Sequence, residues 1–416
     1  MILETWSETE GAPVRRTLPP QAAYALVAAV IGLALFASAT PSPLYGIYRD
    51  LWGFSQVVLT LVYATYAFGV LAALLLAGRI SDEVGRRPVL LVSLGTLIAT
   101  SVLFMLADSV AWLFVARGLQ GLATGLALGA ASAALLDLHP RRDPSGVGLT
   151  NGVASAGGIG LGILVSAALV QLLPAPRVLP YVVLFVLFAV AFAGALLMPE
   201  PVADRSRPRL TPQRPSVPPG VRRPFLLAAL AVLSSWSIAG LFLSLGPQLS
   251  ATVFNTNNHL VTGINIFVLA ACGSVAQLAF GRRAPWVGAS GGSVALAVGT
   301  GILVAAASAD SAVLLLIGSV IGGAGFGVAF LGALRALSVA IPPDHRAAVM
   351  SAFYVVAYMS LSVPAVLAGV GVSPLGLEST FEILGSVAAA IALIVAVEAW
   401  RTRPRAVFSQ PVPRPS

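Results

Sequence analysis

The sequence predicts an all-α membrane protein with twelve transmembrane helices in two pseudo-symmetric bundles of six. Three observations predict this fold class: the composition, twelve long apolar runs, and one long hydrophilic stretch that divides the runs into six and six. Of the 416 residues, 57% are hydrophobic and only 10% are charged, and the mean hydropathy is +0.92. Soluble domains carry about 25% charged residues. The composition therefore excludes a soluble enzyme.

The apolar runs have the length that a helix needs to cross a bilayer, about 20 residues. The alternation of a membrane β-strand is absent from the runs, which argues against a β-barrel. The runs of the first half lie roughly at 21–40, 57–77, 89–107, 110–136, 148–173 and 180–198. Those of the second half lie roughly at 224–246, 260–280, 292–309, 311–337, 347–370 and 379–400.

Basic residues gather on one side of the expected membrane. All 24 are arginines, and the net charge is +8. When the gaps between runs are numbered alternately, one side holds twenty arginines, the other holds only Arg49 and Arg177, and Arg117 and Arg335 lie within runs. Positive residues favour the cytoplasmic side of a membrane. The protein is expected in a bacterial inner membrane with both termini on the cytoplasmic side. This distribution is a topology signal, so nucleic acid is not expected as a partner.

The expected organisation has five parts. The stretch 199–223 is rich in Pro and Arg, which predicts an unstructured cytoplasmic linker. It separates an N-terminal six-helix bundle, 21–198, from a C-terminal bundle, 224–400. Residues 1–20 and 401–416 are expected to be a cytoplasmic segment and a cytoplasmic tail.

The two halves are weakly related at an offset of 202 or 203 residues. The matching glycines are Gly78 and Gly281, Gly85 and Gly288, Gly121 and Gly323, and Gly125 and Gly327. Repetition of this kind, six helices plus six, is typical of transporters that arose by duplication.

Two motifs resemble the major facilitator superfamily. The segment 78–88 reads GRISDEVGRRP and resembles the family's loop between helices 2 and 3, G-x-x-x-D-R-x-G-R-[RK]. Its matching residues are Gly78, Asp82, Gly85, Arg86 and Arg87, whereas Glu83 stands where the family usually has Arg. In the fourth run, Arg117-Gly-Leu-Gln120-Gly121 resembles the family motif R-x-x-Q-G.

Two further segments resemble exporters of that family, in particular bacterial drug/proton antiporters. The end of the first run, Thr40-Pro-Ser-Pro43, is similar to the first-helix motif of exporters. The fifth run contains Gly157, Gly158, Gly160 and Gly162, but only Gly157 and Gly162 match the antiporter motif G-x-x-x-G-P-x-x-G-G. Because glycines three and four residues apart let helices approach closely, helix packing explains these four.

The resemblance implies roles for the charged residues. Asp82 is expected to accept hydrogen bonds from amides at the start of the eleventh span and to steady the outward-facing state. Arg86 and Arg87 are expected to pair with acids or lipid phosphates. A charge as deep as Arg117 usually faces the bundle interior, and Gln120 shares its helix face. The resemblance gives this pair a role in proton coupling or in contact with an anionic substrate; the alternative is that Arg117 reaches the headgroups.

Other polar residues within apolar runs are candidates for lining a central cavity, or alternatively for bonding neighbouring helices. They are Tyr63, Tyr66, Asn265, Gln277, Tyr354 and Tyr358. No Asp or Glu lies near the middle of a run, so the sequence offers no obvious proton carrier. A chain without Lys has no Walker-type ATP site. A single cysteine permits no intrachain disulfide or cysteine-based metal site, and no metal or other cofactor is expected.

The resemblance implies a secondary transporter that works by alternating access and is not an enzyme. Proton-coupled export of a small, moderately hydrophobic compound is the leading hypothesis. Import of a small metabolite by symport or uniport stays open, and a non-transporting membrane sensor is the alternative of another class. The expected partners are a small-molecule substrate, protons and the lipid bilayer, and the expected state is a monomer.

Overall fold

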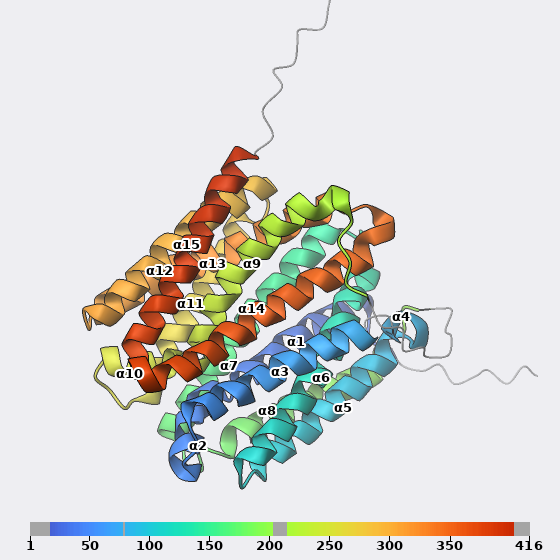
Figure 1. The fold of residues 1–416 in the computed structure, drawn as a ribbon. Coiled ribbons are helices and arrows are strands. Elements are labelled where there is room, and N and C mark those ends of the chain that lie inside the picture. The colour runs from blue at the N-terminus through green and yellow to red at the C-terminus, as the bar shows by residue number, and fades with distance from the viewer. Residues whose placement is uncertain (1–16, 78–79, 203–213, 403–416) are drawn as a thin grey trace, which may run out of the picture.

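The computed structural model describes residues 17–77, 80–202 and 214–402, which are almost entirely helical (Figure 1). Within them, twelve helices are long and apolar enough to cross a membrane. The predicted all-α class with twelve spans is therefore confirmed. Gly78, much of the linker, the first 16 residues and the tail beyond residue 402 lie outside the described residues.

The helices form two groups in space (Figure 1). The first contains α1 (Pro20–Ala39), α2 (Tyr45–Trp52), α3 (Gln56–Ala77), α4 (Ile80–Val84), α5 (Arg86–Met105), α6 (Val110–Leu138), α7 (Pro144–Leu172) and α8 (Leu179–Leu196). The second contains α9 (Arg222–Ser244), α10 (Gly246–Val253), α11 (His259–Phe280), α12 (Pro285–Ser308), α13 (Ala312–Ala340), α14 (Arg346–Leu375) and α15 (Leu377–Arg401). The groups meet where α3 packs on α14 and α7 packs on α11.

The two ends of the bundle differ in what they carry. One end holds α4, the described parts of the linker and both described chain ends, and we call it the linker end (Figure 1). The other holds the short helices α2 and α10, and we call it the far end. Every long helix runs from one end to the other, so a side chain in the middle of a helix lies midway between the ends.

Two helices differ from their predicted limits for reasons of proline chemistry. The first span continues past Ala39 through a 3₁₀ turn into α2 and ends at Trp52. Proline has no amide hydrogen to donate to a helix, and Pro41 and Pro43 break the span at this turn. In contrast, α12 begins at Pro285, seven residues before the predicted run, because proline is well tolerated at the first position of a helix.

Glycines bring the same helix pairs together in both halves. An added Cβ at Gly121 of α6 would overlap the carbonyl oxygen of Tyr66 in α3, and one at Gly323 of α13 would overlap that of Leu269 in α11. The glycine four residues further along each helix meets the same partner helix. The contact between α3 and α6 therefore recurs between α11 and α13 at the offset of the sequence repeat.

Of the four α7 glycines that the sequence assigned to helix packing, three contribute to it. Gly158 and Gly162 bring α7 against α1, because an added Cβ at either position would overlap a backbone carbonyl of α1. Gly160 faces the other half, where its Cβ would lie 3.2 Å from the ring of Phe267. Beyond the adjoining backbone of α7, no described atom lies within 4 Å of a Cβ built at Gly157. The packing interpretation thus accounts for all of them except Gly157.

Candidate functional site

A fully buried arginine lies inside the first half. Arg117 of α6 is 0% exposed. Its Nη1 donates to the Ser38 carbonyl oxygen at 3.0 Å and to Gln120 Oε1 at 2.7 Å. Gln120 in turn donates through Nε2 to the Ala37 carbonyl oxygen at 3.1 Å. The two residues of the R-x-x-Q-G motif thus act as one unit that ties α6 to α1, and Arg117 points into the protein rather than toward the headgroups.

The carbonyls that receive these bonds are exposed by the prolines that follow α1. The last four carbonyls of a helix have no partner within it. Pro41 has no amide hydrogen to give to Ala37, four residues before it, so this carbonyl stays free for Gln120. The negative end of the α1 dipole also faces the Arg117 guanidinium, which is favourable for a cation. The first-helix motif therefore supplies the carbonyl acceptors, and the fourth-helix motif supplies the donors that bind them.

Two tyrosines of α3 face the same guanidinium. Cζ of Arg117 lies 4.4 Å from the ring centroid of Tyr66 and 6.0 Å from that of Tyr63. Yet Nε and Nη2 of Arg117 have no hydrogen-bond partner among the described residues, and the same is true of the buried hydroxyls of Tyr63 and Tyr45. Ring faces attract a cation but bring no negative charge. The charge of Arg117 is thus only partly compensated.

Residues of the second half complete an aromatic wall beside this centre. Tyr358 of α14 belongs to the same buried cluster as Tyr63 and Tyr66, and Tyr354 packs against that cluster. Trp236 of α9 meets Tyr358 edge to face, with ring centroids 5.3 Å apart. The structure therefore brings together the four tyrosines predicted to line a cavity.

Trp236 was not among the residues that the sequence predicted to line the cavity. Its Nε1 is buried without a partner among the described residues. Its position in the sequence is unusual, because tryptophan is enriched at membrane interfaces and Trp236 lies in the middle of a span between serines. This position could have identified Trp236 as a candidate.

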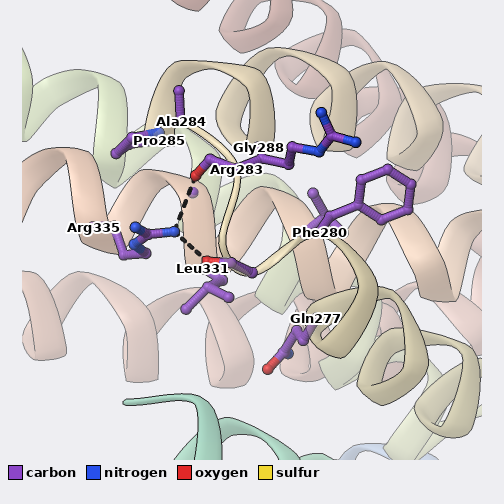
Figure 2. Close-up of a pocket in the computed structure, with 11 residues that line it drawn as sticks. Gln277, Phe280, Arg283, Ala284, Pro285, Gly288, Leu331 and Arg335 are labelled. Carbon is purple, nitrogen blue, oxygen red and sulfur yellow. Dashed lines mark hydrogen bonds between the residues drawn. The ribbon is translucent and has the colours of Figure 1, made fainter. Parts of the chain in front are cut away.

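The two amides predicted to line the cavity lie elsewhere. Asn265 is 0% exposed, and it donates to Ser250 Oγ at 3.1 Å and accepts from Ser319 Oγ at 2.9 Å. It bonds α11 to α10 and α13, which favours the second role that the sequence left open. Gln277 borders a small pocket between α11, α12 and α13 at the linker end (Figure 2).

Arg335, the other arginine within a span, lines this pocket. Its Nη1 donates to the carbonyl oxygens of Gly281 and Arg283, the latter at 3.1 Å (Figure 2). These carbonyls follow the C-terminus of α11, where a cation is favourable. Arg335 therefore serves as a helix cap, whereas Arg117 retains unpaired donors.

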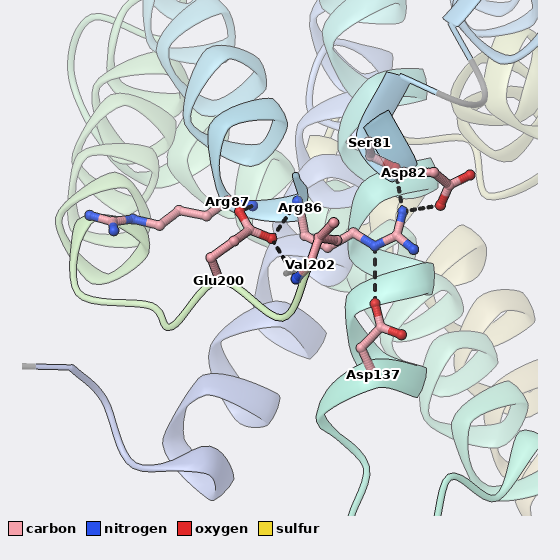
Figure 3. Close-up of polar contacts among 7 residues, drawn as sticks. All are labelled: Ser81, Asp82, Arg86, Arg87, Asp137, Glu200 and Val202. Carbon is pink, nitrogen blue, oxygen red and sulfur yellow. Dashed lines mark hydrogen bonds and ion pairs between the residues drawn. The ribbon is translucent and has the colours of Figure 1, made fainter. Parts of the chain in front are cut away.

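The loop motif forms a charged network at the linker end (Figure 3). Arg86 is ion-paired with Asp82, and its Nε lies 3.0 Å from Asp137 Oδ2. This agrees with the expectation that Arg86 pairs with acids. Among the described residues, no hydrogen bond joins Asp82 to the start of α14. The expected bond belongs to the outward-facing state, and it stays a prediction.

Glu200, just beyond α8, caps the helix that the loop motif begins. Its carboxylate accepts the backbone N–H groups of Arg86 at 2.9 Å, Arg87 at 3.0 Å and Val202 at 3.2 Å (Figure 3). Gly85 has φ of 111°, and an added Cβ there would lie 2.5 Å from the carboxylate. The positive φ thus favours glycine, and a Cβ would also displace the Glu200 carboxylate. Glu200 was missed from the sequence, where its only signal is an acid directly after the sixth run.

Arg87 of α5 in turn caps the C-terminus of α8. Its guanidinium donates to the carbonyl oxygen of Ala195 at 3.1 Å and to that of Leu196, both at the end of α8. These two carbonyls use Nε and Nη2 of Arg87, and the expected contact of Arg87 with acids or lipid phosphates stays a prediction. Each of α5 and α8 is capped by a residue from the other segment.

Three hydrogen bonds join the halves at the far end. They run from Ser42 Oγ to the Leu243 carbonyl oxygen at 2.7 Å, from Gln248 Nε2 to Gln56 Oε1 at 3.3 Å, and from the His259 amide to Gln171 Oε1 at 2.9 Å. Thr60 of α3 also packs so closely on Gly369 of α14 that no Cβ would fit there. The halves are therefore held together at this end.

Comparison with known families assigns the fold and motifs described above. A profile of the Major Facilitator Superfamily matches residues 26–300, more than half of the sequence. The chain belongs to this superfamily. Membership confirms the family that the motifs indicated, and with it a multi-pass membrane protein of a transporter family.

Individual relatives match to different extents. Multidrug resistance protein MdtL from Escherichia coli O157:H7 and that from strain O45:K1 S88 are each 36% identical over 100 residues. The match spans 26% of those relatives and 24% of this chain, so it covers about a quarter of each. The crystal structure of the human organic anion transporter MFSD10 (TETRAN) superposes with a TM-score of 0.66 at 18% identity, covering 91% of this chain and 100% of that one. At this identity the likeness shows the superfamily fold alone.

Proposed function

We propose that the protein exports a small, moderately hydrophobic compound across a bacterial inner membrane in exchange for protons, working as a monomer by alternating access. The observation that carries this proposal is the centre around Arg117. A buried cation with unpaired donors lies beside aromatic side chains from both halves. Residues where two moving halves meet change their exposure when the halves rock, which is what alternating access requires.

Three observations support export of a moderately hydrophobic compound. The wall beside Arg117 is aromatic, as in sites for apolar compounds. The prolines after α1 resemble the exporter motif and hold open the carbonyls that Gln120 uses. The E. coli relatives are named multidrug resistance proteins, although the match spans only a quarter of their length.

Orientation follows from the arginine bias, which assigns the linker end to the cytoplasm. The far end, where three hydrogen bonds join the halves, then faces outward. Reporter fusions at Arg209 and Gln410, both beyond the described residues, test this orientation. Both fusions are expected to report a cytoplasmic location, and a periplasmic signal from either would overturn the twelve-span topology.

Transport itself is tested in proteoliposomes with a panel of compounds and imposed pH gradients of either sign. Proton antiport predicts that an acidic lumen drives uptake of the transported compound, while symport predicts uptake into an alkaline lumen. Facilitated movement insensitive to the gradient would indicate a uniporter, and no movement of any compound a sensor. Protein-free liposomes control for weak bases, which accumulate unaided in acidic lumens.

A further inference from the structure

We propose that the transported compound carries a carboxylate, or an equivalent anionic group, that pairs with Arg117 while its aromatic body lies among the tyrosines of α3 and α14. This rests on the proposed transport function and names the substrate class for the same site. It narrows a moderately hydrophobic compound to an aromatic organic acid.

The first step is the charge balance of Arg117. Both acceptors that its Nη1 uses, the Ser38 carbonyl and the Gln120 amide, are neutral. The ring of Tyr66 is neutral as well. Dipoles and ring faces reduce the cost of burying a cation, but they leave a full positive charge inside the protein. Buried charges in proteins are normally paired, so this site favours an occupant with a negative charge.

The second step is the source of that charge. Asp108 precedes α6, and Asp137 near its other end is paired with Arg86. Arg117, between them, has no ion pair within the described residues, and the described carboxylates lie in loops or near helix ends. The described chain therefore supplies no counter-charge, and the compound is left as the source.

The third step is the geometry of the unpaired donors. Nε and Nη2 share one edge of the guanidinium plane, where their N–H bonds run parallel. This edge binds both oxygens of a carboxylate at once. Nη1, on the opposite edge, is already held by the protein, so the free edge is fixed in place. A rigid fork with two free parallel donors matches a carboxylate better than it matches a single carbonyl oxygen.

The fourth step concerns the rest of the compound. Tyr63, Tyr66 and Tyr358 belong to one buried cluster, and Trp236 packs against it. Stacked and edge-to-face contacts with such rings favour a planar aromatic body. The unpaired Nε1 of Trp236 offers one further donor, in the other half. An aromatic acid therefore satisfies both the charge and the shape of the surroundings.

The test is equilibrium binding to the purified full-length protein in detergent, measured by calorimetry without any gradient. The probes are aromatic carboxylates of one to three rings, each compared with its primary carboxamide and its aminomethyl analogue. Because a charge-assisted hydrogen bond contributes about 1.5–3 kcal/mol, at least one acid is expected to bind about tenfold or more tightly than its amide. Amides or amines that bind as tightly as every acid would overturn the proposal.

Variants assign the preference to Arg117. Arg117→Gln is expected to abolish the difference between acid and amide, and Arg335→Gln, which removes the other arginine within a span, is expected to leave it intact. A preference that survives Arg117→Gln refutes the assignment. If Arg117→Gln does not fold, Arg117→Lys keeps the charge without the fork, and the preference should fall severalfold; an unchanged preference would overturn the pairing. With the wild-type protein, acid binding should weaken as the pH falls through the pKa of the probe, while amide binding stays constant.

These results separate the substrate class from the proposed function. Arg117-dependent binding of acids without proton-driven movement in liposomes would reject proton-coupled export and keep the substrate class. Proton-driven export of neutral compounds, with no preference for acids, would do the opposite.

Discussion

Arg117 of α6 and Ser319 of α13 lie at matching places in the two halves, 202 residues apart, as do Gly121 and Gly323. Each glycine lies so close to a backbone carbonyl of the neighbouring helix that a Cβ would overlap it. The polar residues differ, because Ser319 is paired with Asn265, whereas Arg117 keeps two unpaired nitrogens. The duplicated scaffold thus requires the close glycine contact but leaves the polar centre free to diverge.

The loops after α3 and α11 differ in the same sense. In the first half, Arg86 is held between two acids, Asp82 and Asp137. In the second half, Arg335 donates to backbone carbonyls, which carry no charge. The arginine of the first-half loop is thus paired with carboxylates, whereas Arg335 is paired with helix-end carbonyls.

The strongest way to break this comparison is to change its two central residues. Arg117→Ala and Arg117→Lys are both expected to abolish coupled transport, since neither offers the planar fork. Ser319→Ala should retain most of the transport and cost about 1 kcal/mol of stability, the usual contribution of one hydrogen bond. Transport in proteoliposomes, normalised to membrane protein, measures both. Full activity of Arg117→Lys would show that a positive charge without the planar fork suffices for transport. It would then contradict a specific role of the Arg117 guanidinium.

The shared glycines predict equal effects in the two halves. Gly121→Ala and Gly323→Ala each place a Cβ against a backbone carbonyl, and overpacking of this kind costs about 1–3 kcal/mol. Gly129→Ala in α6 is the matched control, because no described atom beyond the adjoining backbone of α6 lies within 4 Å of its Cβ. Thermal unfolding of the purified proteins should show two destabilised variants and a control that is as stable as the wild type or slightly more stable, since Ala favours a helix more than Gly does. A large effect in only one half would mean that the scaffold is not shared.

Sequence patterns predicted the features that depend on neighbouring or periodically spaced residues. They did not predict contacts between residues that are distant in the sequence. Apolar runs gave the twelve spans because length and hydropathy decide membrane crossing. Motif spacing gave Arg117 with Gln120, which lie one helical turn apart. Glu200 and Asn265 could not be placed in this way, because a cap or an interhelical bond depends on residues more than 50 positions distant. Trp236 was within reach, since its place in the middle of a span is unusual for tryptophan.

A smaller effect is expected at the first-half loop. Asp82→Asn keeps the shape but removes the charge, so the protein should fold while transport falls about two- to fivefold, in line with the 0.3–1 kcal/mol of a carboxylate near a helix start. Arg86 keeps its second acid, Asp137. Asp50→Asn, an exposed acid at the far end, is the control. Undiminished transport by Asp82→Asn at equal expression would remove the conformational role of this loop.

The smallest expected effect concerns the caps that begin α5 and α12. Glu200 accepts the first amides of α5, whereas α12 begins after Ala284 without a side-chain cap. Glu200→Ala would make the first-half helix resemble its counterpart, and a lost cap costs about 1 kcal/mol. The midpoint of thermal unfolding should fall, while transport per folded protein stays unchanged.

Glu378→Ala separates hydrogen bonding from charge in that measurement. Glu378 is an exposed acid in the first turn of α15, so its removal takes away a favourable charge near a helix start. If the bonds to the α5 amides matter most, Glu200→Ala should lower stability more than Glu378→Ala does. Equal losses would assign the effect to the helix dipole alone, because Glu378 keeps only the charge near a helix start.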